Sequence, residues 1–160
     1  METFYINMLN IIHSKDCLKK SILLINKYLP YVMYAFYPLL ILYLFVIKHP
    51  LLMHTLMKPL IAFITVTILR KLINRKRPYE YMNITPLVSH KKGQSFPSRH
   101  TLSAMIIALV TLDIHMTLGI IMIILASLIG ICRILAGVHH ISDVLAGAMY
   151  ALFIYLIKIF

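Results

Sequence analysis

The segment CRILAGVHHISD, residues 132–143, places groups capable of proton and phosphoryl chemistry between two long apolar runs. His139 precedes Asp143 by four positions and His140 precedes it by three, so either imidazole can reach the carboxylate across one helical turn. A neutral imidazole held by a carboxylate is an activated base or nucleophile. Arg133 adds a guanidinium whose planar fork suits two phosphate oxygens. The spacing alone does not choose between the two histidines.

A second polar segment, RKLINRKRP, begins at Arg70. Arg70, Asn74 and Arg77 have the spacing i, i+4, i+7, which predicts that they lie on one face of a helix. The remaining basic residues of the segment are expected to point elsewhere: Lys71, Arg75 and Lys76. The alternative interpretation is a stop-transfer cluster, in which basic residues flank a spanning helix.

A third polar segment, GQSFPSRH, ends at His100. Pro97 and Ser98 are typical of a helix start, with Ser98 as the cap. The free backbone N–H groups of a helix N-terminus suit an anion, and Arg99 and His100 would project from the first turn. A second histidine could serve as a general acid. The alternative is an ordinary capped helix that carries a surface Arg and His.

The composition places these segments in a membrane protein. Of the 160 residues 61% are hydrophobic and 13% charged, with a mean hydropathy of +0.86. The formal net charge is +11, but the basic residues lie mainly between apolar runs. Anionic lipid headgroups or phosphate are therefore the expected partners, and nucleic acid is not.

Apolar runs of roughly the length needed to cross a bilayer, about 20 residues, predict an all-α, multi-pass helical bundle. We expect one domain over residues 1–160, with an interfacial amphipathic helix at 3–29 that ends at Pro30. About five crossings are expected to follow: 31–47, 51–69, a short one at 101–112 that begins near Pro97, 116–132 and 141–160. With five crossings, residues 70–100 and 133–140 fall on the same side of the membrane.

Together the three polar segments resemble the tripartite signature of the type-2 phosphatidic acid phosphatase family, K-x6-RP, PSGH and SR-x5-H-x3-D. The first matches as Arg70, six residues, Arg77-Pro78, and the second as residues 97–100. The third matches as Arg133, five residues, His139, three residues, Asp143. The resemblance therefore selects His139 over His140. The sequence departs from the family pattern at three positions, with Arg70 for Lys, Arg99 for Gly and Cys132 for Ser. Family members also commonly have six membrane crossings, one more than is expected here.

The resemblance implies a mechanism. His139 attacks phosphorus, Asp143 orients its imidazole, and His100 protonates the leaving oxygen and then helps to activate water. The groups implied in holding the phosphate are the side chains of Arg70, Arg77, Ser98 and Arg133 and the backbone N–H of Arg99. No metal or cofactor is implied. The substrate is expected to be a membrane lipid phosphate such as phosphatidate, phosphatidylglycerophosphate or undecaprenyl diphosphate.

Other interpretations predict different behaviour. A non-catalytic lipid-phosphate-binding protein would keep its function without His139. A haem or metal protein would use the eight histidines, but these are scattered along the chain. A vanadium haloperoxidase has a similar pocket, but such enzymes are larger and soluble. The orientation in the cell membrane is open: the family mostly faces outward, whereas the positive-inside rule places the site in the cytoplasm. Thirteen of the 16 Lys and Arg residues are expected on the active-site side, Lys48 and Lys158 are expected on the opposite side, and Lys58 is compatible with either.

Overall fold

The computed structural model describes residues 2–158. Its elements are α1 (Glu2–Ser14), α2 (Asp16–Val46), α3 (Leu52–Ile73), a 3₁₀ turn η1 (Pro78–Glu80), α4 (Arg99–Leu112), α5 (Met116–Leu135) and α6 (Ile141–Leu156). No strand occurs in this part of the chain. The all-α prediction is confirmed.

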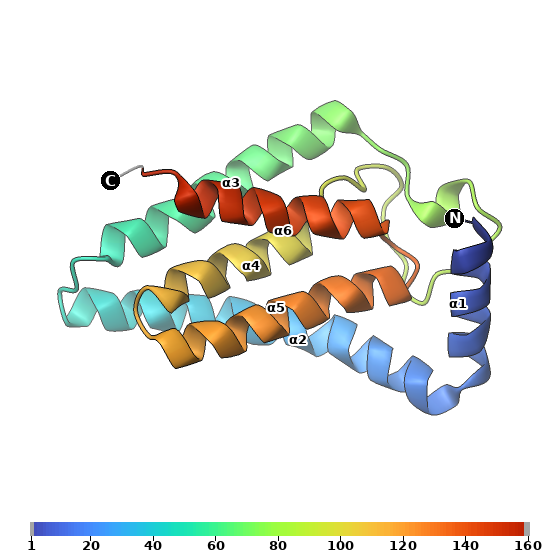
Figure 1. Ribbon diagram of the computed structural model, residues 1–160, viewed down its shortest axis with the longest axis horizontal. Coiled ribbons are helices and arrows are strands. Elements are labelled where there is room, and N and C mark those ends of the chain that lie inside the picture. Colours follow the sequence, from blue (N-terminus) through green and yellow to red (C-terminus); the bar gives the residue numbers. More distant parts are fainter. Residues whose placement is uncertain (1, 159–160) are drawn as a thin grey trace.

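Helices α2 to α6 run lengthwise beside one another, each antiparallel to the next along the chain, and α1 lies across one end (Figure 1). Helix α4 is the most buried of them, because it packs against α3, α5 and α6. Leu102, Ile106 and Val110 of α4 are fully buried. The core therefore surrounds α4, whose first residues carry one of the polar segments.

The bundle spans the membrane. Helices α2, α3 and α5 are long and apolar enough to cross a bilayer. Helices α4 and α6 are apolar but shorter, at 14 and 16 residues, or about 21 and 24 Å. Large hydrophobic side chains such as Leu39, Phe45 and Leu152 are exposed on the outer faces, where lipid would cover them.

The interfacial helix expected at residues 3–29 is wrong in its bounds. Helix α1 ends at Ser14, the chain turns at Lys15, and α2 continues through Pro30 to Val46. Proline in a helix interior costs about 3 kcal/mol, because it removes one backbone hydrogen bond, but neighbouring helices can compensate inside a bundle. Here Pro30 is buried, and one turn earlier the amide of Asn26 donates to the carbonyl of Cys132 on α5 at 3.0 Å. Packing against α5 therefore outweighs the break expected from sequence.

Two smaller expectations also change. Helix α6 ends at Leu156, and residues 159–160 of the expected last crossing lie outside the described residues. Lys58 could reach the membrane surface by sequence alone, yet it is 4% exposed and donates to the backbone carbonyl of Tyr155.

The polar segments meet at the end of the bundle where α1 lies (Figure 1). There the ends of α3 and α5 adjoin the starts of α4 and α6, as the crossing count predicts. The backbone N–H of Ser98 donates to the carbonyl of Asp143 at 2.8 Å, which ties α4 to α6. Gly147 allows this approach, because a Cβ there would lie 2.7 Å from the Ser98 carbonyl oxygen.

Candidate active site

His139 and Asp143 form the buried centre of the site. His139 lies in the turn between α5 and α6 and is 2% exposed, while Asp143 in the first turn of α6 is 0% exposed. Nδ1 of His139 is 3.4 Å from Oδ2 of Asp143. The carboxylate is held from other directions: Ser95 Oγ and the backbone N–H of His140 donate to Oδ2, and Nη1 of Arg75 donates to Oδ1 at 2.8 Å. The orientation of Asp143 is therefore fixed before any ligand binds.

The neighbours of His139 define its tautomer. Nη1 of Arg77 lies 3.5 Å from Nε2 of His139. A guanidinium can only donate, so Nε2 carries the lone pair and Nδ1 carries the proton that faces Asp143. Burial lowers the pKa of His139 to about 4, although the hydrogen bond to Asp143 acts in the opposite direction. At neutral pH the imidazole is uncharged, with its free lone pair directed at a guanidinium.

Three buried arginines converge on this end of the bundle, and each is 5–7% exposed. Arg70 in the last turn of α3 donates from Nη1 to the carbonyl of Pro97 at 2.7 Å. Arg77 donates from Nη1 to the carbonyl of Val138 at 2.9 Å. Arg133 in the last turn of α5 donates from Nη1 to Nε2 of His90 at 3.0 Å. Its Nε is buried and has no hydrogen-bond partner among the described residues.

The start of α4 supplies the second histidine. Ser98 is the N-terminal cap residue by position, as predicted, but its hydroxyl accepts from Thr101 Oγ1 at 2.9 Å and caps no backbone N–H. His100 follows in the first turn, and its ring centroid lies 6.2 Å from that of His90. Arg99 is exposed, and its guanidinium carbon lies 5.5 Å from the ring centroid of Phe63 on α3. The Arg99 side chain therefore packs against an apolar ring, and it is the backbone N–H of this residue that was predicted to bind phosphate.

The expected helical face of Arg70, Asn74 and Arg77 is wrong. Helix α3 ends at Ile73, and Asn74 has a left-handed backbone with φ of 41°. Arg77 therefore reaches the site from the irregular chain that follows the helix. Arg75 was expected to point away from the site, yet it pairs with Asp143.

Sequence reasoning missed three supporting residues besides Arg75. Ser95 lies within the third polar segment and could have been considered as a hydroxyl donor there. His90 is an isolated histidine in a polar loop, with no telling spacing. The Tyr5 hydroxyl of α1 donates to the His139 carbonyl at 3.3 Å and accepts from the Ile141 N–H at 3.2 Å. No local pattern connects Tyr5 to residues that are more than 130 positions away.

His140 belongs to the scaffold of the site. Its ring stacks on Tyr81 with centroids 5.9 Å apart, and its Nε2 lies 3.4 Å from the Lys76 carbonyl oxygen. A carbonyl only accepts, so Nε2 of His140 is protonated and has no free lone pair.

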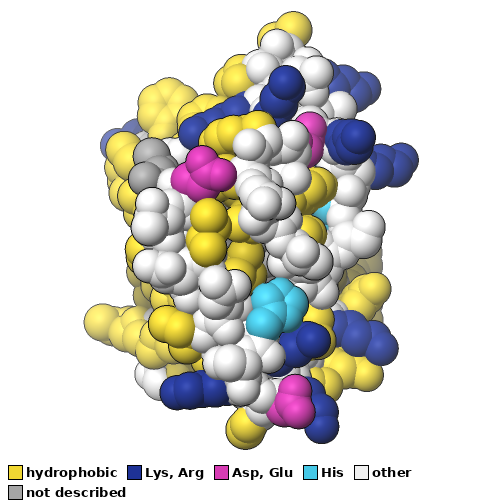
Figure 2. Space-filling view, turned by 90° about the vertical axis from the view of Figure 1, so that its right-hand side faces the viewer, with side chains coloured by type: hydrophobic (Ala, Val, Ile, Leu, Met, Phe, Trp, Pro, Cys, Tyr) yellow, Lys and Arg dark blue, Asp and Glu magenta, His cyan; other side chains and the backbone are white. Residues whose placement is uncertain are grey.

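The surroundings of the site are strongly basic. Figure 2 looks onto this end of the molecule, and Lys and Arg side chains lie around its edge. Exposed lysines near the site include Lys71, Lys76, Lys91 and Lys92. Among residues 2–158, no group of three or more His, Cys, Asp or Glu side chains is arranged to hold a metal ion. The geometry suits an anion bound among arginines beside an uncharged imidazole.

A multi-pass helical bundle that gathers arginines, a His–Asp pair and a second histidine at one membrane face has the features of a membrane enzyme acting on phosphate groups. The family model of the PAP2 superfamily matches residues 50–159. The chain belongs to this superfamily, whose members are lipid phosphatases.

Individual proteins extend this comparison. Over 94 residues the chain is 35% identical to the bacitracin transport permease protein BcrC of Bacillus licheniformis. The matched segment covers 56% of this chain and 46% of that protein. The chain thus spans about half the length of this relative. The crystal structure of Aquifex aeolicus LpxE superposes with a TM-score of 0.77 at 24% identity, covering 96% of this chain and 91% of LpxE. A PAP2-type phosphatidylglycerolphosphate phosphatase from Bacillus subtilis superposes with a TM-score of 0.50 at 25% identity, covering 96% and 89%.

Proposed function

We propose that this chain is an integral membrane phosphatase that hydrolyses a lipid phosphate or diphosphate through a phosphohistidine, without a metal ion. One observation carries the proposal: Nη1 of Arg77, which can only donate, lies 3.5 Å from Nε2 of His139, while Nδ1 of the same ring lies 3.4 Å from Oδ2 of Asp143. A phosphoryl group held by Arg77 would lie beside the lone pair that must attack it. The alternative of a histidine that only fills the core does not explain why its lone pair is directed at a cation.

In the proposed reaction, Nε2 of His139 attacks phosphorus and the bond from phosphorus to the leaving oxygen breaks. His100 gives its proton to that oxygen, and the positive charge on the His139 imidazole is stabilised by Asp143. His100 then takes a proton from water as the water attacks phosphorus. The P–N bond breaks, its electron pair returns to Nε2, and inorganic phosphate leaves. With a diphosphate, the first leaving group is the lipid monophosphate.

The phosphate oxygens are assigned to Arg70, Arg77 and Arg133, together with Ser98 and the backbone N–H of Arg99 at the start of α4. The partnerless Nε of Arg133 supports this assignment, because a buried charged donor normally has an acceptor. Charge that develops on the oxygens in the transition state would be stabilised by donors that are already oriented.

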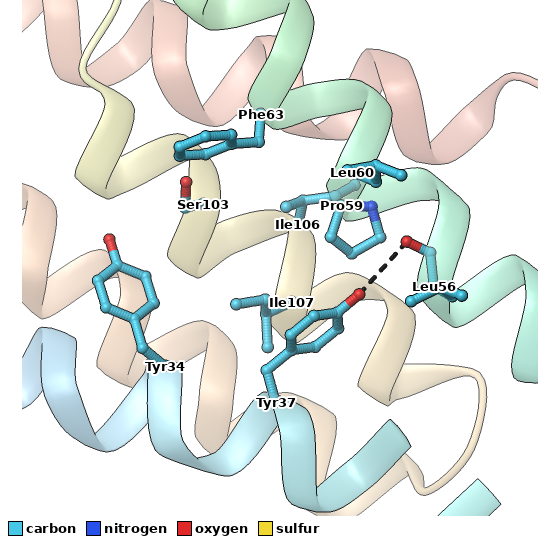
Figure 3. Close-up of a pocket in the computed structure, with 9 residues that line it drawn as sticks. All are labelled: Tyr34, Tyr37, Leu56, Pro59, Leu60, Phe63, Ser103, Ile106 and Ile107. Carbon is cyan, nitrogen blue, oxygen red and sulfur yellow. Dashed lines mark hydrogen bonds between the residues drawn. The ribbon is translucent and has the colours of Figure 1, made fainter. Parts of the chain in front are cut away.

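An apolar cavity of about 410 Å³ between α2, α3 and α4 suits the lipid tail. It is lined by Phe63 and Leu60 of α3, Ile107 of α4 and Tyr34 of α2, and the Tyr34 hydroxyl points toward Ser103 (Figure 3). Ser103 is one helical turn after His100 on α4, so a tail in this cavity would leave its phosphate near the histidine.

The test is phosphate release by detergent-purified protein from phosphatidate, phosphatidylglycerophosphate and undecaprenyl diphosphate. His139→Ala and His100→Ala should each abolish release, whereas His49→Ala, at the opposite end of the bundle, should not. Release should persist in EDTA; loss with the chelator and recovery with a divalent cation would contradict the metal-free mechanism. If the wild-type protein binds these lipids but releases no phosphate, the chain is a non-catalytic binding protein.

A further inference from the structure

His90 lies outside the three signature segments, yet its ring belongs to the same site. It is held in the chain between η1 and α4, where the Tyr79 hydroxyl donates to its backbone carbonyl at 2.9 Å. Its Nε2 accepts from Nη1 of Arg133 at 3.0 Å, and its ring centroid is 6.2 Å from that of His100. The imidazole therefore lies between a proposed phosphate ligand and the proposed acid.

The contact with Arg133 defines the state of His90. Since a guanidinium has no lone pair, Nε2 of His90 must accept, and the ring must be neutral with its proton on Nδ1. The surroundings favour this state, because burial and nearby cations lower the pKa of His90 to about 4. The charged and titratable groups that bear on His90 come from α3, the following loop, α4 and α5: Arg70, Arg77, Tyr79, His100 and Arg133.

The contact with His90 uses only one edge of the Arg133 guanidinium. Nη1 is held by His90, whereas Nε on the other edge has no protein partner within residues 2–158. The edge that carries Nε is one that can bind two oxygens of a phosphate side by side. Arg70 and Arg77 are held by backbone carbonyls instead. Arg70 donates from Nη1 to Pro97, whereas Arg77 donates from Nη1 to Val138 and from Nε to Lys91 and Gly93.

We propose that His90 is a positioning residue that holds Nη1 of Arg133 and so presents the Nε edge of that guanidinium to the phosphate. The inference rests on the proposed function for its substrate, a phosphate monoester or diphosphate. An uncharged acceptor suits this role, since it orients Arg133 without neutralising it. A carboxylate at this position would compete with the phosphate for the same cation. Fixing the side chain in advance removes part of the entropy cost of binding.

The experiment compares His90→Ala with His90→Gln, whose amide oxygen can still accept from Arg133. Ser89→Ala, at the exposed neighbouring position, is the control. With the best lipid phosphate, His90→Ala should raise KM about tenfold, the effect of one charge-assisted hydrogen bond, and leave kcat within about twofold. His90→Gln should restore KM to within about threefold of the wild type. The melting temperature without ligand should be unchanged in both variants.

A second readout does not depend on hydrolysis. The affinity for inorganic phosphate, taken from its effect on the melting temperature, should fall about tenfold in His90→Ala and recover in His90→Gln. In an Arg133→Ala background, His90→Ala should have no further effect, because the interaction that His90 makes with Arg133 is already lost. The four proteins form a double-mutant cycle that isolates this interaction. The proposal is overturned if His90→Ala binds phosphate like the wild type, if His90→Gln is as weak as His90→Ala, or if the two losses add. A wild-type protein that binds phosphate but hydrolyses no lipid would refute the proposed function alone.

Discussion

Helix α1 supports the turn that carries His139, and the hydroxyl of Tyr5 makes hydrogen bonds to that turn. The Tyr5 side chain is 0% exposed, and its hydroxyl bridges the His139 carbonyl and the Ile141 N–H. Its ring packs edge-on against His140 with centroids 6.2 Å apart. The substitution Tyr5→Phe removes the bridge and keeps the ring, so its effect reports the two hydrogen bonds.

The expected magnitude follows from those two bonds. Both are long, at 3.3 and 3.2 Å, and each is worth about 1 kcal/mol net. If both contribute to holding His139, the loss approaches about 2 kcal/mol, or about 30-fold in kcat; one bond alone gives about fivefold. We therefore expect kcat to fall about 5- to 30-fold in Tyr5→Phe. KM should change little, because Tyr5 contacts the backbone of His139 and none of the arginines that are proposed to bind phosphate.

The assay is phosphate release at saturating lipid phosphate, with Tyr28→Phe as the matched control because Tyr28 is 53% exposed on α2. A melting temperature measured in detergent separates a local effect from unfolding. Wild-type kcat in Tyr5→Phe would refute the reasoning that α1 positions the catalytic turn. A rise in KM at constant kcat would show instead that α1 acts on substrate binding.

Further predictions concern the groups around Asp143 and His139. Arg75→Gln should lower kcat at least tenfold by leaving the buried carboxylate without its ion pair, and Arg75→Lys should recover part of the rate; equal kcat in both would contradict this. Ser95→Ala should lower kcat about three- to tenfold through the loss of one hydroxyl on Oδ2, measured against Ser89→Ala. Because burial lowers the pKa of His139 to about 4, the nucleophile loses its lone pair to a proton only as the pH falls toward 4. The proposed nucleophile should therefore cause no acid loss of kcat near pH 6.5, and the pH–rate profile of phosphate release measures this; an acid limb centred near pH 6.5 would contradict it.

The meeting of distant segments was predictable, because each apolar run of about 20 residues crosses the membrane once and so moves the chain to the other side. Apolar runs identify α3 and α5, and alternating crossings then bring residues 70–100 and 133–140 to one end of the bundle. The start of α4 next to Ser98 was also predictable, from the capping preferences of serine and the apolar run that follows.

The identity of the arginine that pairs with Asp143 was not predictable, because it depends on where α3 ends. Helical periodicity carried past Asn74 places Arg77 on one face with Arg70 and turns Arg75 away. The left-handed backbone of Asn74 ends that periodicity, so both arginines reach the site from irregular chain. A single residue at a helix terminus thus reassigns the roles of its neighbours, and propensity does not determine such a terminus to within one residue.

The three buried arginines also distinguish a functional site from a structural ion-pair network. Each of them is held by an uncharged acceptor: the carbonyls of Pro97 and Val138, and the imidazole of His90. The carboxylate at the centre, Asp143, is paired with Arg75. Burying a charge is costly unless it is paired, and a fold that needed these positions only for packing would be as stable with apolar side chains. Carbonyls and a neutral imidazole orient guanidinium groups without neutralising them, so the positive charge remains available to an anion. This arrangement supports the proposed phosphate site, and the His139–Asp143 pair beside it supports the proposed hydrolysis.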